Sequence, residues 1–192
     1  MSQGAHATVH HAEAAHHETS FITTYVFSRD HKMIGKQFLA TGLLMFLVGG
    51  LLALMVRWEL AWPQGEFPFP GLGWISADNP LIPEGHITPN GYNAFFTMHA
   101  TIMIFFAVMP ILVGAFGNFL IPLMIGARDM AFPLLNMLSF WTSVPAMLMM
   151  VGSFFVEGGP AAAGWTSYAP LSADPQWTGV TWATDQMSRH RE

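Results

Sequence analysis

One histidine, His99, lies inside a long run of uncharged residues. The run from Ile87 to Ala127 is 41 residues long and contains no Asp, Glu, Lys or Arg. Such a run is typical of a membrane span, where an imidazole needs a bound metal or a hydrogen-bond partner on a neighbouring helix, because lipid offers neither. The residues alone leave both interpretations of His99 open, a metal ligand and a hydrogen-bonded structural histidine.

If His99 binds a metal, haem iron suits the surroundings. Neutral imidazole is a common axial ligand of haem iron, and the small neighbours Ala100 and Thr101 would let a flat ring approach the helix. The three predicted spans contain no other histidine. A second axial ligand would therefore have to come from elsewhere.

Arg57 and Glu59 form a second candidate, at the end of the first predicted span. The arginine suits an interfacial anchor, or a cation that polarises a carbonyl or carboxylate of a cofactor. The glutamate could then offer oxygen to a hard cation such as calcium. Trp165 and Tyr168 have a default interpretation as aromatic anchors at the membrane interface, and neither identifies a function by itself.

Asp129, Asn118 and Asn136 form a third candidate around the turn 126–129. A carboxylate at the mouth of a membrane bundle collects protons, and asparagines beyond it hold ordered water through which protons move. The competing interpretation is a loop aspartate that caps the third helix or pairs with Arg128.

Three segments must position these residues. Only 10% of the 192 residues are charged while 52% are hydrophobic, and the apolar segments 37–56, 93–113 and 130–156 are each long enough to cross a bilayer. The sequence therefore predicts an all-α membrane protein with three transmembrane helices, which form the N-terminal portion of a larger helical bundle. The absence of cysteine excludes disulfides and thiolate metal sites. The net charge of −5 does not indicate a nucleic-acid-binding surface.

The flanks of the spans predict the topology. Residues 1–28 read as a disordered tail and 173–192 as a polar C-terminal end, and the positive-inside rule places the N-terminus inside. The 57–92 loop and the C-terminal region are then outside, so that His99 lies near the outer face and Asp129 at the inner mouth. The tail histidines could capture a metal weakly, and they are His6, His10, His11, His16 and His17. The basic residues that set the orientation are Arg29, Lys32, Lys36 and Arg128.

Taken together, several stretches resemble the cytochrome c oxidase subunit I family of the haem-copper oxidases. They occur in the family's order over about residues 28–172, and the longest, 122–133, is highly specific. The matching stretches are Asp30–Gly35, Arg57–Leu60, Thr97–Met103, Gly117–Asn118, Pro122–Pro133, Asn136, Ser139–Trp141, Gly164–Trp165 and Tyr168–Leu171.

The resemblance implies a role for each candidate. His99 resembles one of the two axial ligands of the low-spin haem a, and Arg57 the arginine that hydrogen-bonds the haem formyl group. Glu59 resembles a calcium or sodium ligand at the outer face. Asp129 resembles the entry carboxylate of the D proton pathway. The pathway's asparagines would be Asn118 and Asn136, and the residues near the haem propionates Trp165 and Tyr168.

The chain departs from the family at three positions near Asp129. Where the family usually has Pro, Arg and Asn, this chain has Arg128, Leu134 and Met137. A cation beside a carboxylate lowers the pKa of that carboxylate, so we expect proton uptake to be weaker. The spacing from Glu59 to Gly65 is one residue longer than usual, which weakens the case for the cation site.

Larger parts of the family pattern are missing from the chain. They include the other haem a ligand, the high-spin haem ligand, the copper histidines and the inner glutamate of the D pathway, and the polar end 183–192 reads as a truncation, a frameshift or a split subunit. The resemblance therefore implies an iron- and copper-dependent oxidoreductase of the respiratory chain. That enzyme couples electron transport from cytochrome c to oxygen reduction and proton transport, and this chain would not be catalytic alone.

Three hypotheses remain open at this point. The first is the N-terminal part of an oxidase subunit I in a bacterial inner membrane, partnered by the remaining helices or a companion chain, other oxidase subunits, cytochrome c and lipid. The second is a non-catalytic membrane fragment or subunit without haem. The third is a homodimer in which two His99 side chains sandwich one haem as a simple electron carrier.

Overall fold

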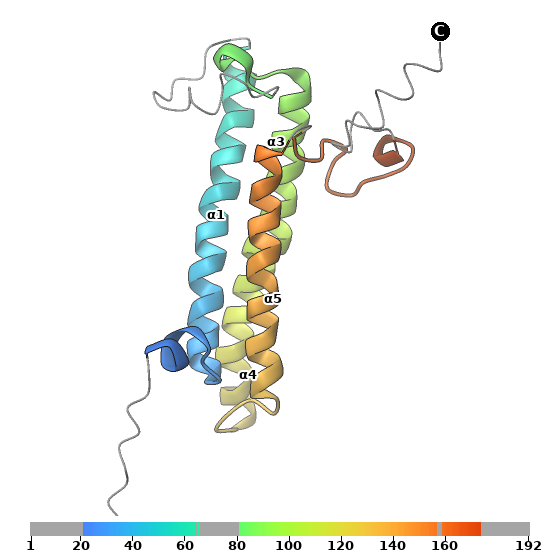
Figure 1. The fold of residues 1–192 in the computed structure, drawn as a ribbon. Helices are drawn as coiled ribbons and strands as arrows, with labels where there is room; N and C mark the ends of the chain where they lie inside the picture. The colour runs from blue at the N-terminus through green and yellow to red at the C-terminus, as the bar shows by residue number, and fades with distance from the viewer. Residues whose placement is uncertain (1–20, 64, 66–80, 157–158, 174–192) are drawn as a thin grey trace, which may run out of the picture.

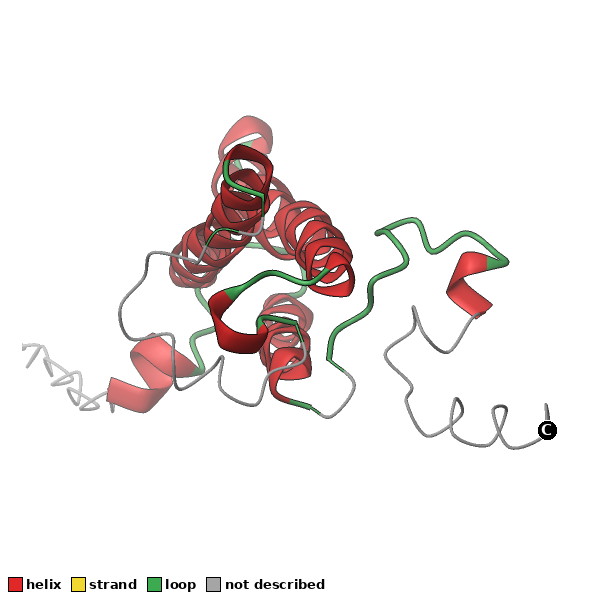
Figure 2. Cartoon of the chain, turned by 90° about the horizontal axis from the view of Figure 1, so that it is seen from above, coloured by secondary structure: helices red, strands yellow, loops and turns green. Residues whose placement is uncertain are grey.

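Three long helices lie side by side in the computed structural model, which describes residues 21–63, 65, 81–156 and 159–173 (Figure 1). The described part contains helices and loops without strands, as Figure 2 shows from above. The predicted all-α fold with three transmembrane helices is confirmed. Of the two predicted terminal segments, residues 1–20 and 174–192 lie outside the described residues, and Ile22–Val26 form a short π-helix, η1.

The first span, α1, runs from His31 to Ala61. It begins where Asp30 caps it, the carboxylate accepting a hydrogen bond from the Lys32 N–H at 3.2 Å. At about 1.5 Å per residue, its 31 residues exceed the roughly 30 Å of a hydrocarbon core. The predicted span 37–56 lies within this helix, and both helix ends extend towards the polar zones of the bilayer.

The second span is one continuous helix from Pro89 to Ile125. Thr88 caps it by accepting from the Gly91 N–H at 3.0 Å, and Gly126, at a φ of +69°, ends it in the left-handed conformation that glycine favours. It is longer than the predicted 93–113 because the uncharged run continues to Ala127. Its parts are α3 (Pro89–Thr101), the π-helical stretches η3 (Ile102–Val108) and η4 (Pro110–Phe116), and α4 (Gly117–Ile125).

The third span, α5, runs from Pro133 to Gly152 and continues as the short 3-10 helix η5 from Ser153 to Phe155. The helix begins three residues later than the predicted start at Met130. Pro133 occupies the first turn, where its missing N–H costs no hydrogen bond, and the residues before it form the turn that follows α4. This turn and His31 lie at the same end of the bundle, which we call the His31 end (Figure 1).

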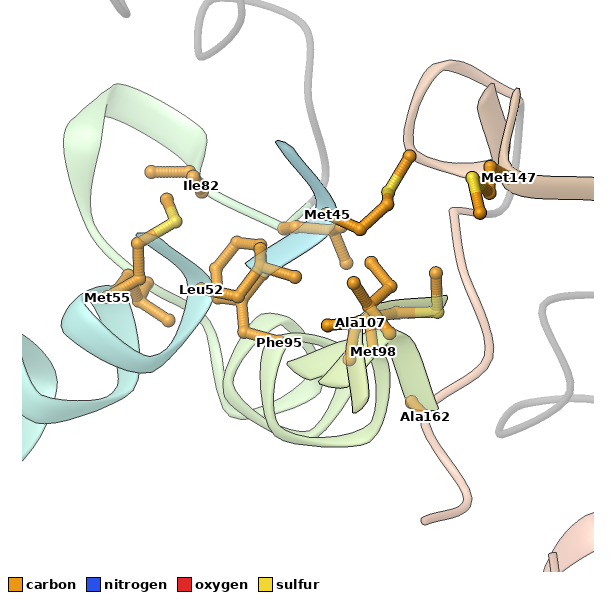
Figure 3. Packing of buried hydrophobic residues seen from close by; sticks show 13 residues of the cluster. Met45, Leu52, Met55, Ile82, Phe95, Met98, Ala107, Met147 and Ala162 are labelled. Atoms are coloured by element: carbon orange, nitrogen blue, oxygen red, sulfur yellow. The ribbon is translucent and has the colours of Figure 1, made fainter. Parts of the chain in front are cut away.

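Glycines bring α1 close to the second span. Gly35, Gly42 and Gly49 are spaced by seven residues, and a Cβ atom added at Gly42 would lie 2.7 Å from Ile111 Cγ1. Small residues at helix contacts are how membrane helices pack closely. Towards the opposite end, which we call the Ala61 end, side chains from α1, α3 and α5 interlock around the buried residues shown in Figure 3, among them Met45, Leu52, Phe95, Met98 and Met147.

The close contact at Gly42 predicts that a larger residue costs more stability at Gly42 than at Gly50. We expect Gly42→Leu to destabilise the bundle by about 1–3 kcal/mol, because the larger side chain has to push Ile111 away. Gly50→Leu is the matched control, since a Cβ atom there would meet nothing within 4 Å. Thermal unfolding in detergent, followed by circular dichroism, measures both. Equal melting temperatures for the two variants would contradict the close packing of α1.

Candidate functional site

His99 lies on α3, in the second span, and is tied to the first span. Its Nδ1 atom lies 2.8 Å from the backbone oxygen of Gly49 on α1. A carbonyl can only accept, so Nδ1 carries the proton and the lone pair of the neutral ring is on Nε2. The half-buried imidazole thus has the neighbouring-helix partner that the sequence analysis left open, and Nε2 is the nitrogen left to ligate a metal.

This arrangement fits one side of a haem. Histidine ligands of metals commonly donate their other N–H to a backbone carbonyl, which fixes the tautomer and makes the ligating nitrogen more basic. The described residues contain no group of three or more His, Cys, Asp and Glu that could hold a metal ion among themselves. Among these residues, His99 therefore fits a haem iron, which needs only one protein ligand on each side, better than a metal ion held by side chains alone.

Arg57 and Glu59 lie in the last two turns of α1, towards the Ala61 end. Arg57 is exposed and Glu59 is half-buried. Gly49, whose carbonyl is bonded to His99, lies eight residues before Arg57 on the same helix. The structure therefore places these two residues about two turns beyond the point at which His99 meets α1.

Trp165 lies beside the second span, although it belongs to the segment after α5. Its ring centroid is 6.4 Å from that of Phe105, six residues after His99 along the helix. Tyr168 is 76% exposed, three residues further on. The structure thus brings Trp165, but not Tyr168, against the helix that carries His99.

Asp129 lies in the turn between α4 and α5 and pairs with a residue far away in the sequence. Its Oδ1 atom lies 2.9 Å from Nδ1 of His31, the first residue of α1, and accepts a hydrogen bond from the Met130 N–H at 2.7 Å. The competing interpretation, in which Asp129 caps the third helix or pairs with Arg128, was wrong. The partner of Asp129 is His31, and the N-cap position of α5 is Phe132, which forms no side-chain cap. The backbone N–H of Met130 and then His31 lower the pKa of the Asp129 carboxyl, so it is held as an anion.

The two predicted asparagines meet inside the bundle. The Asn136 Nδ2 group donates to Asn118 Oδ1 at 2.5 Å, and Asn118 Nδ2 donates to the Gly114 carbonyl at 2.5 Å. Both side chains line an open pocket of about 470 Å³, which Met130 and Ser139 also line. Asp129 directly precedes Met130, one of the lining residues, and accepts a hydrogen bond from its backbone N–H.

Two functional contacts escaped the sequence analysis. His31 appeared there only within a matching stretch, and Gly49 did not appear at all. His31 and Asp129 are 98 residues apart and His99 and Gly49 are 50 apart. Only the cap residue Asp30 marks the start of α1 locally, and no local pattern pairs His31 with Asp129 or singles out the carbonyl of Gly49.

Comparisons with known proteins show which proteins this chain is similar to. The family model described as cytochrome c and quinol oxidase polypeptide I matches residues 33–187. Cytochrome c oxidase subunit 1 of Thermostichus vulcanus is 48% identical over 148 residues, which is 77% of this chain and 23% of that protein. An alternative cytochrome c oxidase subunit 1 of Bradyrhizobium diazoefficiens is 40% identical over 167 residues, 87% of this chain and 25% of that protein.

A relative that is named as a quinol oxidase also matches. A probable quinol oxidase subunit 1 of Staphylococcus epidermidis is 42% identical over 147 residues, which is 77% of this chain and 19% of that protein. The chain thus spans about a quarter or less of the length of these relatives. The stretch that the family model matches includes α3, α4, α5 and the turn with Asp129, and therefore also His99 and the two asparagines.

The contact between His31 and Asp129 predicts a measurable pKa change. We expect His31→Gln to raise the pKa of the Asp129 carboxyl towards its usual value, because one of the groups that stabilise the anion is removed. A carboxyl whose pKa is lowered in the folded state adds stability above its unfolded pKa, and that stability is lost as the pH falls through the lowered value.

The titration can be followed by ¹³C NMR of the Asp carboxyl carbons, assigned with Asp129→Asn. Lys32→Gln serves as the control, since this exposed side chain lies next to His31 in the sequence and is not among the causes of the shift. An unchanged carboxyl pKa in His31→Gln would show that the histidine does not stabilise the anion.

Proposed function

Because this chain belongs to the cytochrome c and quinol oxidase polypeptide I family, we propose that it supplies His99 as an axial ligand of low-spin haem a and Asp129 as a proton entrance. The complete oxidase would pass electrons from cytochrome c to oxygen and move protons outward. Copper and the high-spin haem would be held by helices outside this chain. Other oxidase subunits are the partners that membership of this family implies.

The observation that carries the proposal is the bond from His99 Nδ1–H to the Gly49 carbonyl. It holds the imidazole between two helices and directs the lone pair of Nε2 away from its partner on α1. Haem a, when bound, would accept and release single electrons. The role of α1 and α3 is to fix the orientation of the ligand before any haem arrives.

Three further residues would complete this side of the haem site. Arg57 would hydrogen-bond the haem formyl group, and Trp165 and Tyr168 would lie near the propionates. The position of Trp165 beside Phe105 supports its part in the proposal. We further propose Glu59, half-buried in the last turn of α1, as an oxygen ligand for calcium or sodium.

At the His31 end, the geometry suits proton uptake. The Asp129 carboxylate accepts a hydrogen bond from the backbone N–H of Met130, which lines the same pocket as Asn118 and Asn136, and the asparagine amides can hold ordered water. The lowered pKa keeps the carboxylate anionic, so a proton that it captures is bound weakly and is readily passed on. This proposal places the His31 end and the N-terminus inside, in agreement with the positive-inside rule, and the membrane would be a bacterial inner membrane.

Two other functions remain distinguishable from this one. A fragment without haem would keep the fold, and a homodimer could sandwich one haem between two His99 side chains. The hydrogen bond between Asn136 and Asn118 favours the oxidase over both alternatives, because a simple carrier or an inert fragment has no need for paired asparagines between membrane helices.

The proposal predicts a haem spectrum that depends on His99. We expect the chain, purified in mild detergent with any partner chains, to show a low-spin haem band in the reduced-minus-oxidised spectrum. The band should be lost in His99→Ala, because the iron loses a ligand. His86→Ala is the matched control, since His86 lies in the loop before α3, outside the proposed haem site, and should leave the band unchanged.

The alternatives give different results in the same experiment. One haem for every two chains would support the homodimer. A band that survives His99→Ala would refute the role of His99. The complete absence of haem from wild-type protein and its co-purifying chains would favour the fragment without haem.

A further inference from the structure

The segment after α5 returns to the second span and is bonded to it near His99. The backbone N–H of Gly164 donates a hydrogen bond to Thr97 Oγ1 at 2.9 Å, across 67 positions in the sequence. Thr97 is 3% exposed and lies two residues before His99 on α3. A buried hydroxyl of the second span thus holds the backbone of a distant loop.

The residues before Gly164 are packed into the bundle. Ala162 and Ala163 are both buried, and Ala162 belongs to the same apolar cluster as Phe95 and Met98 of α3 (Figure 3). The hydrogen bond therefore forms next to a buried stretch of the loop, between a buried threonine and a half-buried glycine. In such surroundings, an amide that loses its hydrogen-bond partner raises the free energy of the folded state. The bond therefore favours the one position of the loop in which Gly164 reaches Thr97.

Gly164 itself is constrained on both sides. It has a φ of +83°, in the region that favours glycine, and its carbonyl accepts a hydrogen bond from the Ser167 N–H at 3.2 Å. Its N–H is bound by Thr97 and its C=O closes the following turn. The direction in which the chain leaves Gly164 is consequently fixed, and Trp165 is the next residue.

The indole of Trp165 reaches along the second span from this fixed point. Thr97 lies two residues before His99, and Phe105, whose ring centroid is 6.4 Å from that of Trp165, lies six residues after it. These two contacts are about 12 Å apart along the helix axis, and His99 lies between them in the sequence. Trp165 thus packs on the stretch of the second span that carries His99.

We infer that Thr97 is a positioning residue, which fixes Gly164 and thereby holds Trp165 against Phe105, on the stretch of the second span that carries the His99 ligand. This inference rests on the proposed function, in which haem binds at His99. A bulky ring fixed beside a haem edge limits the access of water, and the local dielectric sets the reduction potential of the iron. Loss of the bond would release Trp165 and change that potential.

Thr101 shows what a hydroxyl without this role does. It donates to the Thr97 carbonyl at 2.8 Å, within its own helix, as threonine commonly does in membrane helices. Thr97 Oγ1 instead accepts a hydrogen bond from a different segment. Thr97→Val and Thr101→Val are therefore a matched pair, because each loses one hydroxyl from the same helix but only the first loses the contact to Gly164.

Amide hydrogen exchange tests the contact directly. In Thr97→Val we expect the Gly164 amide to exchange about tenfold faster or more, because its buried acceptor is gone. The indole N–H signal of Trp165, assigned with Trp165→Phe, should shift in the NMR spectrum. Thr101→Val should change neither, and Thr97→Ser, which keeps the hydroxyl, should restore both. Unchanged Gly164 exchange in Thr97→Val, or equal changes in both valine variants, would overturn the inference.

The haem-loaded protein gives a separate test. The midpoint potential of the low-spin haem should shift in Thr97→Val at unchanged haem content, and not in Thr101→Val. An unshifted potential, with Trp165 displaced, would overturn the placement of Trp165 beside the haem. Absence of haem from all variants would refute the proposed function instead, while Gly164 exchange and the Trp165 signal would still decide whether Thr97 positions the tryptophan.

Discussion

The hydrogen bond between His99 and the Gly49 carbonyl is the interaction on which the arrangement of this bundle depends. Within a bilayer, an imidazole has no water to satisfy its N–H, so the neighbouring helix has to supply the acceptor. Gly49 can do so because it has no side chain. A Cβ atom there would lie 2.7 Å from Met103 Sδ, so a larger residue would have to displace the Met103 side chain. Close packing and the orientation of His99 thus depend on the same residue, Gly49.

The two ends of the bundle carry different chemistry because water reaches them differently. At the His31 end, the exposed Asp129 carboxylate is stabilised as an anion by a backbone N–H and by His31, and the next residue, Met130, lines a pocket with the paired asparagines. Nearer the Ala61 end, the polar contacts of His99 and Thr97 are partly buried between helices and a loop, next to the apolar cluster of Figure 3. This separation suits the proposed function, in which protons enter at one face and an electron carrier is held near the other.

The fold was largely predictable from the sequence and the long-range contacts were not. Apolar length and the absence of charge predicted three membrane helices, although the second span runs on to Ile125 because Gly126, and not a change in polarity, ends it. The resemblance assigned Asn118 and Asn136 to one pathway, but the hydrogen bond between them was not predicted. Likewise, the partners of Asp129 and His99 depend on how helices pack side by side. A backbone carbonyl such as that of Gly49 has no signature in the sequence, and Arg128, the nearest cation in the chain, proved to be the wrong partner for Asp129.

The most direct test of the central claim is the tautomer of His99, measured by ¹⁵N NMR of histidine-labelled protein in detergent and assigned by comparison with His99→Ala. A hydrogen bond from Nδ1 to the Gly49 carbonyl requires a proton on Nδ1, and in the neutral ring this leaves Nε2 unprotonated. The account therefore predicts, for His99 without bound metal, one pyrrole-type signal from Nδ1 and one pyridine-type signal from Nε2. The opposite assignment, with the proton on Nε2, would contradict it, because that ring could neither donate to Gly49 nor present Nε2 to iron.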